Sequence, residues 1–422
     1  MRSAACNLEN ELAKISLRFA HDGYFTRSEV RVEQDGAILA ESVIDSDSPT
    51  YALTPSHWQF DIASLTKLFT TTAILRLASQ QKINLDSDIA HQNWAAPLIE
   101  AVRLEQDSAQ VHELLSRLTI ASLLTHTSSL PAWYPFYAGR EARIHAGLET
   151  QMPKAQQIDR EAQSKKDALH EAFGIPGDFF SIIDSAIKSE NRVPLGQMLY
   201  SDINFMLLGV IAGVVLQSHA LGEAMEHLVL APLALGDTTF EPDFGRVVPT
   251  EFGNRIEMEM VRSRGLTFSG WRPIDLPLCG QADDGNSFYY FDGLAGHAGL
   301  FSTARDLCSL CNLYLFEGRR PTSGATRWGS AEVLDPALAK RAATNTGLGR
   351  GLGFEFGPRY PDGFGHTGFT GTMVYINPER RLSVAILTNR LNVPEPRSVD
   401  PYRSAIVQAI LASQNPTFSL GS

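Results

Sequence analysis

The chain has 422 residues, of which 44% are hydrophobic and 20% charged, and its formal net charge at pH 7 is -11. A globular chain of this length and composition buries a large core, so we expect one large domain or two closely packed ones. Binding to phosphate backbones or anionic lipid needs clustered Lys and Arg, so the acidic balance argues against nucleic acid as a partner.

The N-terminal segment, "MRSAACNLENELAKI", lacks the apolar stretch of a signal peptide and carries Glu9 and Glu11 early. We therefore expect the chain as written to be cytoplasmic. The residues "SAAC", which end at Cys6, resemble the end of a lipoprotein cleavage site, so a periplasmic or lipid-anchored location would follow only from a start farther upstream. The longest apolar run, 206–216, has eleven residues and predicts a buried helix, because about twenty are needed to span a bilayer.

Both ends of the chain carry β-hairpin patterns. Near the N-terminus, residues 28–44 alternate polar and apolar side chains around the Asp-Gly pair at 35–36, which suits a tight turn. Near the C-terminus, the β-rich segments 372–376 and 382–388 flank a turn at the Asn-Pro pair 377–378. The sequence between the two hairpins is mostly helical in pattern.

Two segments of the middle have alternative interpretations. Residues 159–173 are charged with little apolar periodicity, which favours a solvated helix over part of a lid, and whether the segment 140–195 acts as a lid stays open. Residues 293–307 join a glycine-rich loop to a helix that begins at Thr303, with Asp306 three residues later as in a capping box. No P-loop or dinucleotide fingerprint is present, so we attribute these glycines to backbone crowding.

The order of these patterns predicts an α+β fold. An antiparallel sheet built from both chain termini is flanked by helices, and a largely helical region is inserted between its parts. In residue terms, we expect 1–90 and 281–422 to form the sheet domain and 91–280 the mainly helical region. The last ten residues, 413–422, are expected to be frayed.

The segment "DIASLTKLFTTT" places Ser64 three residues before Lys67, so both side chains share one face of a helix. A buried lysine either pairs with an anion or loses its proton more readily than in water, and a neutral amine can deprotonate a serine. The backbone N–H of a serine at a helix N-terminus points to where an oxyanion would develop. The neighbouring side chains predict a helix that is buried nearly all round: Leu65, Leu68, Phe69, Ala73, Ile74 and Leu77.

A Ser-x-x-Lys tetrapeptide also occurs by chance, so its interpretation depends on the other motifs in the chain. "YSD" follows at 200–202 and offers Tyr200 as a second proton carrier, and "HTG" follows at 366–368 and opens the C-terminal hairpin. In this order the three segments resemble the active-site motifs of the penicillin-recognising serine hydrolases, specifically the branch of class C β-lactamases and D,D-carboxypeptidases. The resemblance covers roughly residues 20–390.

The resemblance implies a β-lactamase/D,D-peptidase-like fold that forms a single catalytic unit, with the active site between the sheet domain and the helical region. It implies an acyl-enzyme mechanism in which Ser64 is the nucleophile and Lys67 and Tyr200 share general-base and general-acid roles. The backbone N–H groups of Ser64 and Phe369 would form the oxyanion hole. No cofactor is implied.

The same resemblance assigns the substrate contacts to the "HTGF" segment. His366, Thr367, Gly368 and Phe369 would lie on an edge strand against which an extended substrate pairs. His366 stands where many relatives have lysine, facing a substrate carboxylate. Because a histidine carries little charge above its usual pKa of about 6.5, we expect acidic substrates to bind more tightly as the pH falls.

Asp202 is a second departure, because many relatives have asparagine at this position. An ionised carboxylate accepts hydrogen bonds and donates none. If Asp202 approaches Lys67, it should favour the charged ammonium and shift the role of proton carrier toward Tyr200.

The remaining candidate residues are interpreted as structural. The chain has four cysteines, Cys6, Cys279, Cys308 and Cys311, and we read them as buried, reduced thiols because no second pair of metal ligands accompanies the last two. His126 and His297 lie at a turn and in a loop, without a metal-ligand partner at useful spacing. We therefore expect no metal site.

Several activities remain open within this resemblance. A D-amino-acid peptidase of the D,D-carboxypeptidase type, or a related amide or ester hydrolase, is favoured over a class C-type β-lactamase and a small-ester esterase. A penicilloyl sensor without turnover, or a scaffold, is a further alternative. The α/β-hydrolases are excluded because no Gly-x-Ser-x-Gly motif occurs. The expected partner is a small molecule or short peptide, with a D-amino acid or carboxylate; the rate of deacylation and the oligomeric state stay open.

Overall fold

The computed structural model describes residues 2–46, 58–105, 107–146, 160–218, 220–320 and 331–414. Parts of four sequence predictions lie outside the described residues. They are the thiol of Cys6, the first residue of the charged segment at 159, the stretch 147–159 of the suggested lid, and the tail from 415.

A six-stranded antiparallel sheet takes its strands from both ends of the chain, in the order β2-β1-β10-β9-β8-β7. The strands are β1 Arg27–Gln34, β2 Ala37–Asp45, β7 Glu355–Phe356, β8 Phe364–Thr367, β9 Met373–Asn377 and β10 Leu382–Thr388. The first hairpin turns at Asp35 and Gly36, both with positive φ. Strand β1 then pairs with β10, with Ser28 opposite Thr388. The α+β prediction and both hairpins are thus confirmed.

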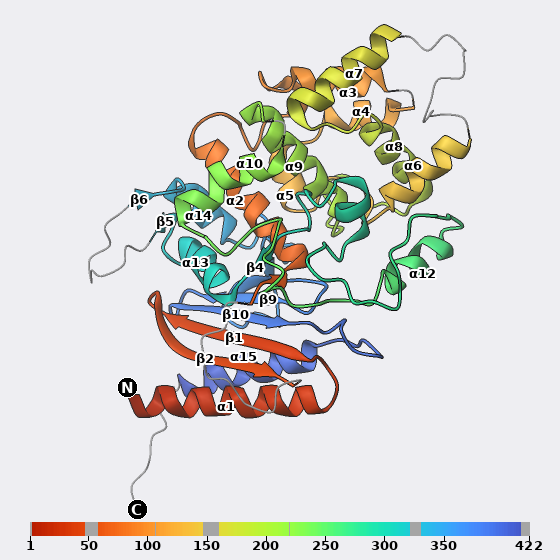
Figure 1. Cartoon of the computed structure of the whole chain (residues 1–422). Helices are drawn as coiled ribbons and strands as arrows, with labels where there is room; N and C mark the ends of the chain where they lie inside the picture. The colour runs from red at the N-terminus through yellow and green to blue at the C-terminus, as the bar shows by residue number, and fades with distance from the viewer. Residues whose placement is uncertain are drawn as a thin grey trace, which may run out of the picture.

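Helices cover both faces of this sheet (Figure 1). The outer face carries α1, Arg2–His21, and α15, Asp400–Ser413, which pack against each other and the sheet around an apolar cluster. The buried hydroxyl of Tyr402 in α15 lies 2.8 Å from Ser16 Oγ in α1 and 2.7 Å from Ser28 Oγ in β1. One tyrosine therefore joins the last helix to the first helix and the first strand.

The inner face is covered by α13, Ala304–Leu315. Its start is as predicted, because the side chain of Thr303 accepts a hydrogen bond from the backbone N–H of Asp306. Cys308 and Cys311 of this helix are buried free thiols, as predicted, whereas the free thiol Cys279 is only partly buried. Burial raises the pKa of both thiols, which therefore stay protonated at neutral pH.

Above α13 lies the helical part of the molecule, centred on α2, Thr66–Ser79, and α9, Asp202–Leu216 (Figure 1). The apolar run 206–216 is the end of α9 and is largely buried, as expected. Side chains from 163 to 173 in α7, Arg160–Phe173, are exposed or partly exposed, in agreement with a solvated helix. Among the described residues, no single helix is long and apolar enough to cross a membrane, while one bent pair, Asp202–Leu216 with Leu221–Leu233, passes that test by length and composition.

The remaining elements are short and connect these layers. The α-helices are α3 Ala96–Leu104, α4 Ala109–Leu115, α5 Ile120–Leu124, α6 Phe136–His145, α7 Arg160–Phe173, α8 Phe179–Ser189, α10 Leu221–Met225, α11 Ala231–Leu233, α12 Arg255–Ser263 and α14 Pro336–Ala342. The 3-10 and π-helical turns are η1 Ala63–Leu65, η2 Ile89–His91, η3 Glu226–Leu230 and η4 Asn286–Tyr290. Two small ladders pair β3 Phe60–Asp61 with β4 Phe301–Ser302, and β5 Arg319–Arg320 with β6 Ala331–Glu332.

Candidate active site

Ser64 and Lys67 meet at the start of α2. Ser64 lies in the 3-10 turn η1, directly before the helix, and Lys67 lies in the first helical turn with its side chain fully buried. The Nζ of Lys67 donates a hydrogen bond of 2.8 Å to Ser64 Oγ. The structure therefore brings the two residues together as their spacing predicts.

A buried lysine either pairs with an anion or loses its proton more readily than in water. Lys67 pairs with an anion. Its Nζ lies 2.8 Å from Asp202 Oδ1, and it donates a hydrogen bond of 3.0 Å to the carbonyl oxygen of His297. Burial by itself lowers the pKa of Lys67, but Asp202 and Tyr200 outweigh it and raise the pKa above its ordinary value. In the free protein Lys67 is thus a charged ammonium at neutral pH.

Tyr200 lies beside this ion pair, two residues before α9 begins. Lys67 Nζ is 5.2 Å from the centre of its ring, and the ring of His126 is 4.6 Å away, centre to centre. Burial raises the pKa of the phenol, although the nearby charge of Lys67 and hydrogen bonding to Lys67 and Ser64 act in the opposite direction. Tyr200 is therefore a neutral phenol in the resting site, able to donate a proton.

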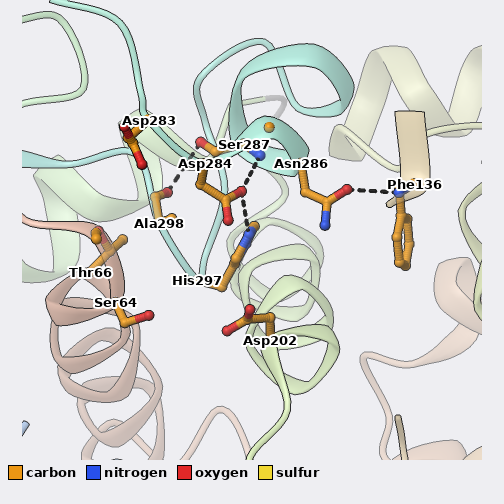
Figure 2. Close-up of polar contacts among 12 residues, drawn as sticks. Ser64, Thr66, Phe136, Asp202, Asp283, Asp284, Asn286, Ser287, His297 and Ala298 are labelled. Carbon is orange, nitrogen blue, oxygen red and sulfur yellow. Dashed lines mark hydrogen bonds and ion pairs between the residues drawn. The ribbon is translucent and has the colours of Figure 1, made fainter. Parts of the chain in front are cut away.

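The glycine-rich loop before β4 delivers the carbonyl group that holds Lys67. A Cβ at Gly296 would lie 2.2 Å from the carbonyl oxygen of Phe205, so the predicted backbone crowding is real and places this loop against α9. The next residue, His297, binds Lys67 through its carbonyl, while its Nε2 lies 2.9 Å from Asp284 Oδ1 (Figure 2). His297 has a structural role, as predicted, and its carbonyl oxygen binds Lys67 directly.

His126 also has a structural role, because its ring packs against that of Tyr200. Its backbone has a φ of 58°, and its Nδ1 accepts a hydrogen bond of 3.0 Å from the backbone N–H of Ser201. Nδ1 is therefore the unprotonated nitrogen. Burial, followed by the charges of Arg350 and Lys67, lowers the pKa of His126 well below 6.5. The ring that packs against Tyr200 is therefore neutral.

Asp61 is a functional residue that the sequence reasoning missed. Its Oδ1 accepts a hydrogen bond of 2.8 Å from the N–H of Ala63, which has a positive φ of 46°. Its Oδ2 accepts one of 2.7 Å from the N–H of Asp283, and its backbone carbonyl accepts one from Thr370 Oγ1. Asp61 thus fixes the turn that presents Ser64. The available signal was the Asp two residues before Ala63, the pattern of an Asx turn.

The "HTGF" segment runs from β8 into the loop before β9. His366 and Thr367 pair with Val374 and Met373 of β9. Gly368 donates its N–H to the carbonyl of Thr372 at 2.7 Å, and Phe369 is 43% exposed. The oxyanion roles of the Ser64 and Phe369 N–H groups stay predictions.

The expectation that this segment is an edge strand applies to His366 and Thr367 but not to the whole of β8. The short strand β7 forms the edge of the sheet and pairs with Phe364 and Gly365 of β8. Only the outer side of β8 at His366 and Thr367 has no strand pairing within the described part of the chain. A two-residue strand carries no periodic signal, which is why the sequence did not reveal β7.

The expected charge of His366 is also corrected. The ring is 3% exposed, and its Nδ1 lies 2.8 Å from the carbonyl oxygen of Thr367, so Nδ1 carries the proton. Burial, followed by the positive charges of Arg350 and Lys67, lowers the pKa of His366 well below 6.5. His366 therefore stays neutral at physiological pH and does not become the cation that attracts an acidic substrate.

Asp202, Ser64 and Lys67 come from separate elements that converge on one point, and Figure 2 shows Ser64 beside α2 and Asp202 at the start of α9. This geometry supplies a serine hydroxyl, a lysine that can relay its proton, a carboxylate and a phenol. Among the described residues, no group of His, Cys, Asp and Glu side chains could hold a metal ion. The arrangement suits nucleophilic acyl transfer.

Comparison with known proteins points the same way. Residues 34–409 match the family described as Beta-lactamase. The N-acetylmuramyl-L-alanine amidase of Bacillus subtilis (strain 168) is 27% identical over 379 residues, which cover 86% of this chain and 74% of that protein. A protein of Escherichia coli (strain K12) named "Putative D-alanyl-D-alanine carboxypeptidase" is 25% identical over 376 residues, covering 85% of this chain and 74% of its own.

Among solved structures, the octameric penicillin-binding protein homologue from Pyrococcus abyssi is similar with a TM-score of 0.60. The two chains are 18% identical, and the similarity covers 96% of this chain and 78% of the other. At this identity the likeness concerns the fold, which is the β-lactamase/transpeptidase-like fold expected from the three motifs.

Proposed function

Because this chain belongs to the β-lactamase family of serine hydrolases, we propose that it hydrolyses an amide bond in short peptides that contain a D-amino acid, through an acyl-enzyme on Ser64. The observation that carries the proposal is the contact of Lys67 Nζ with both Ser64 Oγ and Asp202 Oδ1, each at 2.8 Å. The names of the two relatives support amide substrates, since both describe the cleavage of bonds to alanine.

The first step needs a base, and the resting Lys67 is protonated. The ion pair of Lys67 and Asp202 holds as many protons as the neutral pair of amine and carboxylic acid. Moving one proton from Nζ to Oδ1 therefore frees the amine without exchange with solvent. The amine then takes the proton of Ser64 as Oγ attacks the substrate carbonyl.

The second step breaks the tetrahedral intermediate. Tyr200 donates its proton to the leaving amine and recovers one from Lys67, which regains the proton held by Asp202. The acyl group then remains on Ser64 as an ester. Water releases it by the reverse use of the same groups, and the site returns to the ion pair with which it began.

The proposal is tested by two measurements on the full-length protein and on Ser64→Ala. Intact-protein mass spectrometry after brief exposure to benzylpenicillin should show a long-lived adduct that Ser64→Ala lacks. An acylated peptide ending in D-Ala-D-Ala should release D-alanine faster than its D-Ala-L-Ala counterpart.

A short-lived adduct with accumulating hydrolysed penicillin would show that the protein is a β-lactamase and not a peptidase. Hydrolysis of simple esters without peptide cleavage would show that it is an esterase. If neither penicillin, peptide nor ester reacted with Ser64, the hydrolase assignment of the site would be wrong.

A further inference from the structure

Asp284 is a carboxylate near the active site that belongs to none of the three motifs. It lies two residues before η4, and its Oδ1 accepts a hydrogen bond of 2.7 Å from the backbone N–H of Ser287. The Nε2 of His297 lies 2.9 Å from the same oxygen (Figure 2). Burial by itself raises the pKa of Asp284, but the contacts with His297 and Ser287 outweigh it and lower the pKa below its ordinary value. Asp284 is therefore an ionised carboxylate at neutral pH.

The contact with Asp284 determines how the ring of His297 is held. Because an ionised carboxylate only accepts hydrogen bonds, Nε2 is a nitrogen that carries a proton. The ring is 1% exposed, and its Nδ1 is buried without a hydrogen-bond partner in the described part of the chain. Within that part of the chain, Asp284 is thus the polar anchor of the His297 side chain.

The backbone on either side of His297 is attached to α2. Thr70 Oγ1 donates a hydrogen bond of 2.7 Å to the carbonyl oxygen of Gly296, and Thr66 Oγ1 accepts one of 3.3 Å from the N–H of Leu300. These two contacts set the path of the loop. The side-chain anchor then sets the direction of the His297 carbonyl, because a residue whose side chain and flanking backbone are both held has little freedom in ψ. That direction is toward the amine of α2, at 3.0 Å.

The carbonyl of His297 differs chemically from the other groups that surround Lys67 Nζ. Ser64 and Tyr200 offer hydroxyl groups, which donate or accept, and Asp202 gains a donor when it takes up a proton. A backbone carbonyl can only accept. One N–H of Lys67 therefore stays on this carbonyl in both the ammonium and the amine form, and the lone pair of the amine is left facing the other groups.

We propose that Asp284 is a positioning residue for acyl transfer: through the side chain of His297 it holds the carbonyl that keeps the lone pair of Lys67 available to Ser64. If this carbonyl turned away, the amine could rotate its lone pair away from the nucleophile, and fewer encounters with substrate would lead to attack. The role rests on the proposed function only as far as the acyl-enzyme on Ser64, and it is independent of which acyl donor reacts.

The two residues that flank this position are held by other carboxylates. Asp61 Oδ2 accepts a hydrogen bond of 2.7 Å from the N–H of Asp283, and Glu257 Oε1 accepts one of 3.0 Å from the N–H of Gly285. A Cβ at Gly285 would lie 2.0 Å from Glu257 Oε2, so these two segments are in close contact. A substitution of the Asp284 side chain is therefore expected to release the imidazole without displacing its own backbone.

The experiment measures acylation by two esters, a p-nitrophenyl ester and an alkyl ester of the same acid, in stopped-flow. Asp284→Ala should lower the acylation rate constant on the order of a hundredfold, the cost of a displaced catalytic group, and leave the dissociation constant of each ester unchanged. Asp284→Asn should restore most of the rate, since its amide oxygen still accepts hydrogen bonds from His297 and Ser287.

The two leaving groups identify the step that is affected. A p-nitrophenolate leaves without a proton, whereas an alkoxide needs one from Tyr200. Because activation of Ser64 precedes both departures, the loss in Asp284→Ala should be the same for the two esters. A loss confined to the alkyl ester would assign the effect to protonation of the leaving group and would overturn the proposal.

A double-mutant cycle tests whether Asp284 acts through His297. His297→Ala should lose as much rate as Asp284→Ala, and the double variant should lose no more than either single variant, because both remove the same contact. His297→Gln should keep part of the rate, since its amide N–H can donate to Asp284. Losses that multiply in the double variant would contradict the inference.

The control for a general loosening of the fold is Asp178→Asn. Asp178 is also a buried carboxylate bound to η4, but its partners are Tyr290 Oη at 2.7 Å and Arg140. This variant should lower the melting temperature at least as much as Asp284→Ala and leave acylation unchanged. Acylation that fell in parallel with the melting temperature in both variants, or that stayed unchanged in Asp284→Ala, would overturn the proposal.

The esters also separate this proposal from the proposed function. If the wild type reacted with the esters but cleaved no peptide, the peptidase proposal would fail, while the ester series would still decide the role of Asp284.

Discussion

At the scale of single residues, the chemistry depends on how the carboxylate of Asp202 affects the protonation of Lys67. Asp202 raises the pKa of Lys67 against the effect of burial, and it is also the nearest acceptor for the proton that Lys67 must give up. The same residue therefore holds the site in its resting charge state and allows it to leave that state. An asparagine at this position would do neither.

This reasoning predicts the behaviour of Asp202→Asn. Without the carboxylate, burial lowers the pKa of Lys67, and the amine must lose its proton to solvent. Acylation by a penicillin or ester should fall on the order of a hundredfold at pH 6, the lower end of what a positioned acid–base group contributes. The acylation rate of the variant should also increase with pH, because the amine of Lys67 must first lose its proton to solvent. Stopped-flow acylation from pH 5 to 9 measures both effects, and an unchanged pH profile would remove Asp202 from the mechanism.

A second prediction concerns the pH dependence of substrate binding. Burial, followed by the charges of Arg350 and Lys67, lowers the folded-state pKa of His366 well below its ordinary value of 6.5, so the ring resists protonation as the pH falls. Arg350, Lys67 and Arg359 face it with positive charge, and each opposes its protonation. The KM for a carboxylate substrate should therefore be flat from pH 5.5 to 8 in the wild type and in His366→Asn. A KM that falls severalfold toward pH 5.5 only in the wild type would restore a charged His366.

At the scale of elements, the turn η1 places a residue with positive φ, Ala63, directly before Ser64. Ala63 adopts a left-handed conformation, which L-residues seldom occupy, and the two hydrogen bonds to the Asp61 carboxylate hold this turn against Asp283. Burial, followed by the charge of Asp283, raises the pKa of Asp61 to about 7.

Asp61→Ala should consequently lower kcat on the order of a hundredfold with little change in KM, because a small displacement of a nucleophile is costly. Asp61→Asn should be less damaging, since its amide oxygen retains one acceptor. Steady-state kinetics on a neutral ester separates the two parameters. Equal losses in both variants would mean that charge, and not the positioning of the turn, is what Asp61 contributes.

The elements also show what the sequence could and could not predict. The Asp-Gly hairpin, the cap at Thr303 and the buried helix that contains 206–216 were predicted because each depends on residues close in sequence. Ser64, Lys67 and Tyr200 were found because they belong to motifs. The strand β7, the link from Asp61 to Asp283 and the position of Arg350 were not, because each depends on contacts between distant segments without a local pattern.

At the scale of the whole molecule, the first and last described helices hold one another on the outer face of the sheet. Tyr402→Phe removes the hydroxyl that joins α15 to Ser16 of α1 and Ser28 of β1, and leaves two buried serine hydroxyls without this partner. The free energy of unfolding should fall by about 1–3 kcal/mol. Urea denaturation measures this change.

The activity of Tyr402→Phe supplies the control. Tyr402 packs on the outer face of the sheet, and Ser64 lies with the elements of the other side, so kcat on a neutral ester should stay at its wild-type value. A lost activity at unchanged stability would show that the two faces are coupled.

The pairing of β1 with β10 has a consequence for the order in which the protein is made. A ribosome releases the hairpin of β1 and β2 before β10, so Ser28 cannot pair with Thr388 until the chain as far as β10 has been synthesised. Until then, the edge of β1 that will pair with β10 is unpaired, and unpaired strand edges tend to associate with other chains. Thr370, whose hydroxyl binds the backbone carbonyl of Asp61, is also translated long after Ser64, so the turn that presents the nucleophile lacks this contact until residue 370 has been made.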